Sequence, residues 1–393
     1  MEYINCDVCG SNSYTKVSQN TSQTINCGGS VFIKDTIDVV CDTCGQVYNN
    51  PMMTDDELSE LYHSMSRNVT DAVKVDYAML PIEEAQHMFI KECIDLPDGA
   101  KIFDIGCSLG GFLKLFVGDG FECVGCEPSI SDAKVAVEQG IKVINRMFDP
   151  ADYEPHSFDL IALRFVFEHL RQPSKMLTDL MGLLKPNGFI FIEVPNMAEP
   201  YVGLDSFFSF GHLYTFSKDT LAQIAKVNRY NIHAIAEVDN SHIPRRTFAS
   251  LRMLITHGEK SEDIINYQEN SLDLCARYLE KREKLITLIQ QRFESIELDH
   301  FKSIIIYGAG THTAELLNRF PFLKESCIGF VDGNKDFRGH PYFGKMVYSP
   351  GKLPTLSFDA IVISAREAEG EILQYLESVN LADRAIPIYK HIL

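Results

Sequence analysis

The sequence contains no apolar run of about 20 residues, the length that a membrane-spanning helix needs. Its first residues also lack the basic and apolar regions of a signal peptide. Basic residues are in deficit, since 36 Lys and Arg stand against 54 Asp and Glu and give a net charge of -18. This charge repels nucleic-acid backbones but does not exclude a small phosphorylated molecule. We therefore expect a cytoplasmic protein without a membrane or nucleic-acid partner.

Internal repeats and low-complexity segments are also missing. The 393 residues, 45% hydrophobic and 23% charged, have the composition of globular domains with substantial cores. Changes of pattern along the chain predict a cysteine-rich module, a central α/β domain with leading helices, a helical connector and a smaller α/β domain. These parts cover residues 1–53, 54–256, 257–300 and 301–393, respectively. Residues 1–53 are expected to form short strands and turns. Thr54 and Glu57 have the spacing of a capping box at a helix start.

The 11 cysteines are odd in number, and a reducing compartment makes a disulfide framework unexpected. Four of them form two matched pairs, Cys6-x-x-Cys9 and Cys41-x-x-Cys44, and a glycine follows each pair. Glycine permits the tight turn that directs both sulfurs of a pair to one ion. Four thiolates complete a tetrahedral Zn²⁺ site, which predicts a structural zinc. The alternative is two unrelated pairs of free thiols. The other cysteines are expected to be small core residues.

In the central region, short apolar segments alternate with helical patterns, as in a parallel sheet covered by helices on both faces. The expected strands cover residues 101–105, 122–127, 141–144, 158–163 and 188–194. Between residues 260 and 298 the chain has neither proline nor glycine, and apolar residues recur at helical spacing. This pattern predicts a long connecting helix.

A glycine-containing loop follows the first of these strands. Asp104 and Gly106 end the strand, and Gly110 and Gly111 let the backbone approach a ligand. The spacing is not that of a G-x-G-x-x-G phosphate loop. Glu127 ends the second strand 23 residues after Asp104, where its carboxylate can accept bonds from ribose hydroxyls. From these residues alone, a nicotinamide cofactor or a plain doubly wound domain stays open.

Further along, the chain reads Phe167-Glu168-His169 and Leu184-Lys185-Pro186-Asn187-Gly188. These segments, after the loop and Glu127, resemble class I S-adenosylmethionine-dependent methyltransferases over about residues 84–240. The resemblance implies an α/β Rossmann-like fold with S-adenosylmethionine as cofactor. It implies methionine contacts for Asp104, Gly106 and Gly110, ribose contacts for Glu127 and adenine contacts for Met147 and Phe148. The other residues assigned to the cofactor are Cys107, Pro128 and Arg164.

The layout of a zinc module, a methyltransferase domain and a C-terminal half-Rossmann domain resembles the sugar C-methyltransferases. That resemblance implies a nucleotide-linked 4-keto-6-deoxy sugar as substrate. It rests also on Tyr62-His63-Ser64 and on the segment from Gly211 to Ser217. It implies that His212 acts as the base, that Tyr62 assists and that Tyr214 is a third catalytic candidate. His169 is a candidate substrate contact.

The chemistry suits this assignment. A carbon beside a ketone must lose a proton before it attacks a methyl sulfonium, and a histidine titrates near working pH. A tyrosine hydroxyl can stabilise the enolate oxygen. The chain departs from the family in two places: Cys107-Ser108-Leu109 replaces an Asn-Asp-Gly element, and Gly211 replaces a glutamate before His212. A structural histidine at position 212 and a packing role for Tyr62 therefore stay open.

The C-terminal region repeats a strand, a glycine turn and a helix start between Ser303 and Ala314, and Asp332 ends the next expected strand. Thr313 replaces the third glycine of a nicotinamide fingerprint, and the region is too short for a complete dinucleotide domain. We expect one mononucleotide-type half that faces the methyltransferase domain and binds a pyrophosphate at the helix N-terminus. The candidate contacts are Gly310, His312, Lys335 and Arg338. A pure folding or dimer module is the alternative.

The sequence thus predicts an enzyme with three folded parts that methylates a small molecule and is a monomer or a homodimer. Two other functions stay open. The chain could be an O- or N-methyltransferase of another cytoplasmic metabolite, which needs less help from a base. It could also be a non-catalytic assembly protein that keeps the cofactor fold for interaction.

Overall fold

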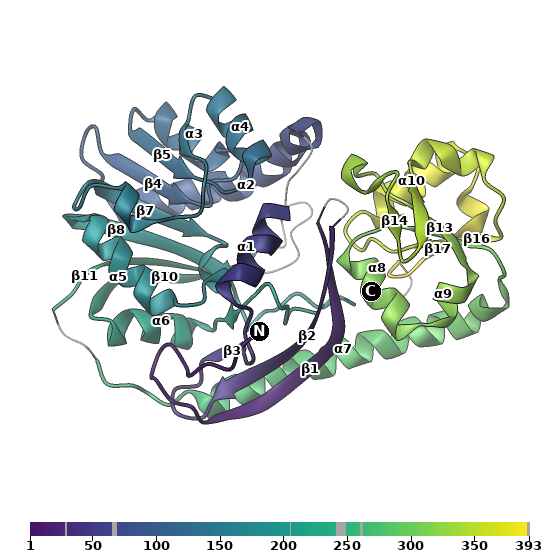
Figure 1. Cartoon of the computed structure of the whole chain (residues 1–393), viewed down its shortest axis with the longest axis horizontal. Coiled ribbons are helices and arrows are strands. Elements are labelled where there is room, and N and C mark those ends of the chain that lie inside the picture. The colour runs from purple at the N-terminus through teal and green to yellow at the C-terminus, as the bar shows by residue number, and fades with distance from the viewer. Residues whose placement is uncertain (28–29, 65–68, 205, 241–248, 260–261, 391–393) are drawn as a thin grey trace. The chain divides into compact units, whose positions relative to one another are not determined.

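The computed structural model describes residues 1–27, 30–64, 69–204, 206–240, 249–259 and 262–390 (Figure 1). The chain forms two compact units. The first unit comprises Met1–Gln19, Thr36–Tyr201 and Phe208–Ala276, and the second comprises Asn20–Asp35, Val202–Phe207 and Arg277–Leu393. In the described part of the chain, no helix is long and apolar enough to cross a membrane.

A seven-stranded sheet forms the centre of the first unit, in the order β10-β11-β8-β7-β4-β5-β6. The five strands from β8 to β6 run parallel, as expected. Their bounds are Lys101–Ile105 (β4), Glu122–Cys126 (β5), Lys142–Ile144 (β6), Phe158–Arg164 (β7) and Leu184–Pro195 (β8). All five predicted strands are therefore confirmed, with boundaries that differ by a few residues.

The other edge of this sheet differs from the expected all-parallel pattern. Strand β11 (Ser250–His257) pairs antiparallel with β8, and β10 (Tyr230–Val238) pairs antiparallel with β11. A parallel pairing of consecutive strands needs a crossover of a dozen or more residues, usually with a helix. The connection from Val238 to Ser250 is too short for that crossover, which explains the reversed direction.

Helices cover both faces of the sheet (Figure 1). On one face lie α2 (Val69–Cys93), α3 (Gly111–Gly118) and α4 (Ile130–Glu138), and on the other lie α5 (Pro173–Leu183) and α6 (Lys218–Val227). Phe112 and Phe116 of α3 pack against Ile102 and Leu160 of the central strands, and all four are fully buried. This core holds the carboxyl ends of β4 and β5 in fixed positions.

The N-terminal region contains long strands, so the expectation of short ones was wrong. Strands β1 (Tyr14–Cys27) and β2 (Ser30–Cys41) have 14 and 12 residues and are followed by β3 (Val47–Asn49). The tip, Asn20–Asp35, belongs to the second unit, where Gln23 and Thr24 are buried, so these polar strands gain packing that the sequence pattern does not reveal. Strand β9 (Tyr214–Thr215) completes a four-stranded sheet in the order β1-β2-β3-β9.

Helix α1 (Asp55–Ser64) begins with the predicted capping box. The backbone N–H of Thr54 donates to Glu57 Oε2 at 2.9 Å, and the N–H of Glu57 donates to Thr54 Oγ1 at 3.3 Å. Helix α7 (Gln268–Ser295) confirms the predicted long helix. Its residues from Arg277 onward belong to the second unit.

The second unit contains a six-stranded sheet in the order β14-β15-β13-β12-β16-β17. Its strands are Ile304–Tyr307 (β12), Cys327–Val331 (β13), Pro341–Tyr342 (β14), Lys345–Tyr348 (β15), Ala360–Ile363 (β16) and Ala385–Pro387 (β17). All pairs are parallel except β14 with β15. The two strands expected from Ser303 and before Asp332 are present as β12 and β13, whereas the short strands β14, β15 and β17 were not predicted.

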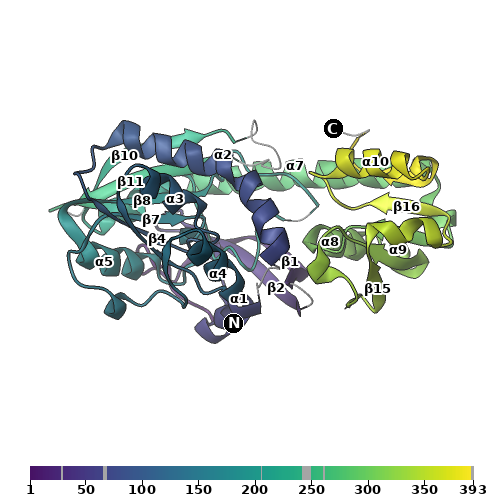
Figure 2. The same ribbon diagram turned by 90° about the horizontal axis from the view of Figure 1, so that it is seen from above.

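Alternate residues of β12 face two separate cores. Ile304 and Ile306 pack with α7, α8 (Thr311–Arg319) and α9 (Phe322–Ser326), whereas Ile305 and Tyr307 pack with α10 (Glu369–Ser378). Figure 2 shows α10 on one face of this sheet and α8 and α9 on the other. The two-sided burial explains why the strand reads as an uninterrupted apolar run.

Candidate functional site

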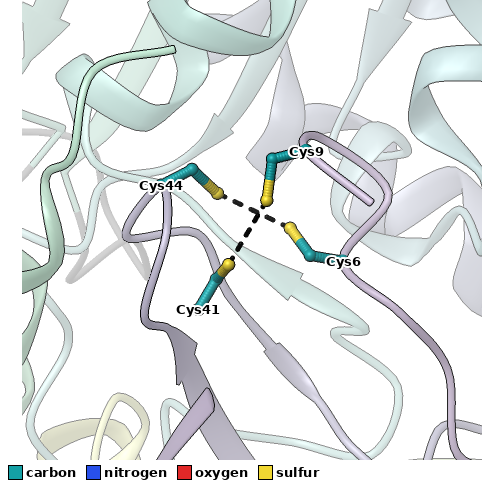
Figure 3. Close-up of side chains that lie close together, drawn as sticks. All are labelled: Cys6, Cys9, Cys41 and Cys44. Carbon is teal, nitrogen blue, oxygen red and sulfur yellow. Dashed lines mark hydrogen bonds between the residues drawn. The ribbon is translucent and has the colours of Figure 1, made fainter. Parts of the chain in front are cut away.

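The four cysteines of the two predicted pairs meet at one point (Figure 3). The sulfurs of Cys6 and Cys44 lie 3.6 Å apart, and those of Cys9 and Cys41 lie 3.5 Å apart. All four sulfur atoms lie within 4.8 Å of one another. A tetrahedral zinc with bonds of about 2.3 Å separates its sulfurs by about 3.8 Å, so this cluster has the dimensions of such a site.

Tight turns aim the sulfurs of each pair. The backbone N–H of Gly10 donates to the carbonyl of Cys6 at 2.8 Å, and that of Gly45 donates to the carbonyl of Cys41 at 2.9 Å. Both glycines have left-handed φ angles, +74° and +79°, as the sequence predicted. The turn chemistry after each pair is therefore confirmed.

The glycine loop connects β4 to α3 and closes on the end of β5. Gly106 and Gly110 adopt φ angles of +72° and +83°, and Ser108 between them is also left-handed at +48°. The N–H groups of Gly106 and Cys107 both donate to the carbonyl of Cys126, at 2.8 and 3.1 Å. Cys107 is fully buried, and burial raises the pKa of its thiol well above the ordinary value. Gly106 and Ser108 are the half-buried positions of this loop, whereas Cys107, Leu109 and Gly110 are buried.

Glu127 holds the loop from the end of β5. Its Oε2 accepts the N–H of Ser108 at 2.9 Å, and its Oε1 accepts the N–H of Ser129 at 2.7 Å. Glu127 is 8% exposed, and the neighbouring Pro128 is half-buried. A carboxylate that already accepts two N–H bonds here can also accept ribose hydroxyls.

Asp104 is buried beneath the loop and forms an ion pair with Arg164. Arg164 donates to the two carboxylate oxygens of Asp104 at 3.3 and 2.8 Å, and to Gln86 at 3.1 Å. Burial raises the pKa of Asp104, while the charge of Arg164 opposes the rise. Both residues were predicted to contact the cofactor. The structure joins them to each other, and Asp104 has no exposed surface.

The two expected adenine contacts lie on the segment after β6. The side chain of Phe148 stacks on Tyr153 with ring centroids 5.7 Å apart and lies 6.0 Å from Phe103. Met147 is 45% exposed. An aromatic ring beside an exposed methionine, at the same edge of the sheet as Glu127, offers apolar surface to a flat ring system.

A second cluster brings together Tyr62, Glu168, His169 and His212. Glu168 and His169 belong to the short 3-10 helix Phe167–His169 after β7, and His212 precedes β9. The rings of His169 and His212 pack edge to face at 4.9 Å, and Tyr62 packs edge to face on His169 at 6.1 Å. One ring nitrogen of each histidine and a Glu168 oxygen lie within 4.8 Å of one another. The structure thus unites three predicted residues that are up to 150 positions apart.

The titrating groups of this cluster are shifted by burial. Burial raises the pKa of Glu168 to about 8 and lowers the pKa of His169. Burial, and then the charge of Glu168, raise the pKa of Tyr62 above its ordinary value. Glu168 received no role from sequence reasoning, although its apolar surroundings in Val166-Phe167-Glu168 are a signal of a buried carboxylate.

Tyr214 has a different environment. Its ring stacks on Tyr48 at 6.1 Å and on Phe216 at 6.2 Å, and its hydroxyl donates to the carbonyl of Arg171 at 3.3 Å. It is 1% exposed and belongs to β9 of the four-stranded sheet. These contacts tie Tyr214 to the sheet of the cysteine module.

In the second unit, two of the predicted substrate contacts already have partners. His312 Nδ1 lies 2.8 Å from Ser364 Oγ, and its Nε2 contacts the hydroxyl of Tyr389. Arg338 Nε donates to the carbonyl of Asp332 at 3.0 Å. Asp332 itself accepts the N–H of Ala309 at 2.7 Å, while Lys335 is exposed.

The carbonyl of Gly310, the remaining candidate, accepts the Tyr342 hydroxyl at 3.0 Å. Thr313, which stands where a nicotinamide loop has its third glycine, is fully buried and donates to Gly308 O at 2.9 Å. Its side chain therefore fills the space that a close backbone approach at that position would use.

Comparison with known proteins identifies two segments. Residues 83–234 match the family model described as a methyltransferase domain, and residues 300–387 match the one described as C2185-like, N-terminal. A C-methyltransferase, NovU, from Streptomyces niveus is 27% identical over 161 residues, which cover 36% of this chain and 37% of that protein. A ubiquinone biosynthesis O-methyltransferase from Photobacterium profundum is 27% identical over 105 residues, which cover 25% of this chain and 45% of that protein.

The chain thus matches less than half of the length of these curated relatives. Among solved structures, a SAM-dependent methyltransferase from Aquifex aeolicus aligns with a TM-score of 0.37 and 19% identity, covering 48% of this chain and 99% of that one. The family match and the strand order together make residues 83–234 a methyltransferase domain with the α/β Rossmann-like fold.

Proposed function

We propose that this chain transfers a methyl group from S-adenosylmethionine to a small molecule. The observation that carries the proposal is the glycine loop of the methyltransferase domain, which Glu127 Oε2 holds at Ser108 while its Oε1 accepts the N–H of Ser129 at the start of α4. Bound there, S-adenosylmethionine would supply an electrophilic methyl group on a sulfonium. The loop from Gly106 to Gly110 would hold its methionine part and Glu127 its ribose, with Pro128, Met147 and Phe148 beside the adenine.

The buried pair Asp104–Arg164 supports the loop from below in this proposal. Arg164 pairs with Asp104 and fixes its orientation, so the two side chains form a buried ion pair that supports the loop. Cys107 packs in the core beside the loop and contributes its backbone.

For the acceptor, we propose a nucleotide-linked keto-deoxysugar that is methylated on carbon. His212 would take the proton from the carbon beside the ketone, and the resulting enolate carbon would form the new bond to the methyl group. The carbon–sulfur bond breaks in the same step and its electron pair stays on sulfur. The ring of His169 packs against both His212 and Tyr62, which supports this proposal, as does the name of the relative NovU.

O-methylation of another metabolite is the second candidate. It is favoured by Gly211, which leaves His212 without an acidic neighbour in the sequence, and by relatives named ubiquinone biosynthesis O-methyltransferases. A hydroxyl group needs less activation than a carbon-bound hydrogen, so a weaker base suffices. Failure to bind S-adenosylmethionine at all would instead favour an assembly role without catalysis.

The other parts of the chain have supporting roles in this proposal. The four cysteines would hold a structural zinc, because their spacing suits a closed tetrahedral site. We keep the division of the chain into four parts, with boundaries at residues 53, 256 and 300. The C-terminal part would contribute contacts to the substrate through its glycine turn. Gly310, His312, Lys335 and Arg338 are the proposed contacts there.

Cofactor binding is tested by calorimetry with S-adenosylmethionine. Glu127→Gln removes one charged acceptor, and loss of bonds worth about 1.5–3 kcal/mol lowers the affinity by about tenfold to a hundredfold. Glu122→Gln, at the exposed start of β5, is the matched control and leaves the affinity unchanged. Equal affinity of Glu127→Gln and the wild type contradicts the assigned ribose site.

Carbon methylation is tested by solvent deuterium exchange into a nucleoside-diphosphate 4-keto-6-deoxy sugar, without cofactor. The wild type should exchange the hydrogen beside the ketone, and His212→Ala should lose this exchange while it still binds S-adenosylmethionine. Unchanged exchange in His212→Ala would remove His212 as the base. Methyl transfer to a hydroxyl acceptor without any carbon exchange would select the O-methyltransferase alternative.

A further inference from the structure

The cluster of Glu168, His169 and His212 has the composition of a metal site. Two imidazoles and one carboxylate place one ligand atom each within 4.8 Å of one another. This donor set suits divalent transition metals, and catalytic sites of this kind use three protein ligands and leave a position open. The cluster belongs entirely to the first unit and is separate in sequence from the four cysteines.

The orientation of His169 favours ligation. Its Nδ1 lies 2.5 Å from the carbonyl of Gly211, which only accepts, so Nδ1 carries the hydrogen. The lone pair therefore resides on Nε2, which points to Glu168 Oε1 at 3.8 Å. A histidine that ligates a metal usually donates its other ring N–H in this way, to a backbone carbonyl or a carboxylate.

The burial of Glu168 is the second observation. Its side chain is 3% exposed, and its Oε2 has no hydrogen-bond partner within the described residues. The hydroxyl of Tyr62 beside it is likewise buried without such a partner in that part of the chain. A buried polar oxygen without a partner costs folding free energy. A metal ion that carries a bound oxygen ligand would give a partner to both Glu168 Oε2 and the Tyr62 hydroxyl.

We propose that Glu168, His169 Nε2 and His212 bind one divalent transition-metal ion, with an open position for an oxygen atom of the acceptor. The ion would polarise a ketone or hydroxyl oxygen of the acceptor. His212 would then be a ligand, because an ion and a proton compete for the same lone pair. The inference goes beyond the proposed function: it competes with the assignment of His212 as base but not with methyl transfer.

Cobalt(II) is the probe, added to the full chain with its native cysteine-bound metal in place. The wild type should bind about one cobalt per chain with the weak visible absorbance of nitrogen and oxygen ligands, distinct from the strong absorbance of thiolate ligands. Glu168→Gln and His212→Ala should each weaken this binding by at least about tenfold. His300→Ala, an exposed histidine of the second unit, is the matched control and should bind as the wild type does.

The outcomes separate the two proposals. Binding of S-adenosylmethionine by each variant reports an intact first unit and the proposed function, independently of cobalt. Cobalt binding that is equal in the wild type and in both cluster variants would overturn the site. So would a wild type that binds S-adenosylmethionine but takes up no cobalt other than at thiolates.

Discussion

At the scale of single residues, the ion pair beneath the glycine loop has the largest expected energetic effect. Arg164 is the charged partner of Asp104, and its guanidinium also lies 4.3 Å above the ring of Phe112. Replacing it by methionine keeps much of the apolar contact but leaves a buried carboxylate without its cation. We expect Arg164→Met to lower the free energy of unfolding by about 3–5 kcal/mol, measured by urea denaturation.

An exposed arginine provides the control for this prediction. Arg146 pairs with Asp152 but is 54% exposed, so Arg146→Met should change stability by at most about 1 kcal/mol. Simultaneous replacement of Asp104 and Arg164 by leucine should recover part of the loss, because the Asp104 carboxylate is then gone, although Glu83, 3.7 Å from the Arg164 guanidinium, still loses that cation. A single Arg164 variant as stable as the Arg146 variant would contradict the ion-pair argument.

The sequence allowed the positions of Asp104 and Glu127 to be predicted, because each ends a recognisable strand. It did not reveal that Arg164 pairs with Asp104, 60 residues earlier, since only the parallel pairing of β4 and β7 brings them together. Glu168 was missed for a similar reason. Its environment is made by Tyr62 and by the segment before β9, which no local pattern connects to it.

At the scale of elements, the two cysteine turns provide a matched pair of variants. Gly45 has φ +79°, and an added Cβ would lie 2.4 Å from the carbonyl carbon of Tyr267, whereas Gly10 has φ +74° with nothing within 4 Å. Gly10→Ala should cost only the backbone term of about 1 kcal/mol. Gly45→Ala should cost at least about 2 kcal/mol, because overpacking is added to that term.

Chemical denaturation of both alanine variants with metal bound measures this difference. Metal content by elemental analysis should stay at that of the wild type in Gly10→Ala. Equal losses in the two variants would mean that the contact with Tyr267 relaxes and that backbone strain alone decides stability.

Strand β2 should give the protein a dependence of stability on pH. Asp38 is fully buried, and burial raises its pKa to about 7 despite hydrogen bonds from Ser18 and Asn49. The folded state therefore holds this proton more tightly than the unfolded chain, where aspartate titrates near about 4. The contribution of Asp38 to the free energy of unfolding is fully present below about pH 4. It falls as pH rises from about 4 to about 7, and a further rise in pH does not change it.

Asp38→Asn removes this titration. Between pH 5 and 8, the variant should gain about 1–3 kcal/mol of stability relative to the wild type, measured by urea denaturation at each pH. Asp56→Asn, exposed on α1, should follow the wild type at every pH. Parallel pH profiles of wild type and Asp38→Asn would show that Asp38 is ionised in the folded protein across this range.

The elements that sequence periodicity predicted well are those buried on one or both faces in a regular way, such as β4, β7 and α7. The reversed strand β11 and the length of the β1–β2 hairpin were not predictable in this way. Strand direction depends on how the connection folds, and the polar residues of the hairpin gain partners only in the tertiary structure. The roles of the site residues remain predictions, although the structure brings Tyr62, His169 and His212 together.

At the scale of the whole molecule, the net charge of -18 should make stability depend on salt. Repulsion among acidic groups opposes the compact state, and salt screens it over a Debye length of about 10 Å at 0.1 M. Raising sodium chloride from about 0.02 to about 0.2 M at pH 7.5 should raise the melting temperature by about 2–4 °C, as a gain of about 1 kcal/mol would. Differential scanning calorimetry measures this.

The same salt increase near pH 5.1, the isoelectric point of the sequence, is the control. The net charge there is close to zero, so the melting temperature should change much less. If salt raises the melting temperature by the same amount at both pH values, the cause is preferential exclusion of salt from the protein surface and not screening of charge.

Strand β9 gives the cysteine module a consequence for protein engineering. Val47 and Tyr48, three and four residues after Cys44, pair with Thr215 and Tyr214, and the N–H of Asn49 donates to the carbonyl of Leu213 at 2.9 Å. His212 directly precedes Leu213 in the chain, so the cysteine module cannot be exchanged independently of the residues around His212. A chimera that exchanges the first 50 residues must also carry a compatible β9, or it will misalign the histidine whose chemistry it was meant to keep.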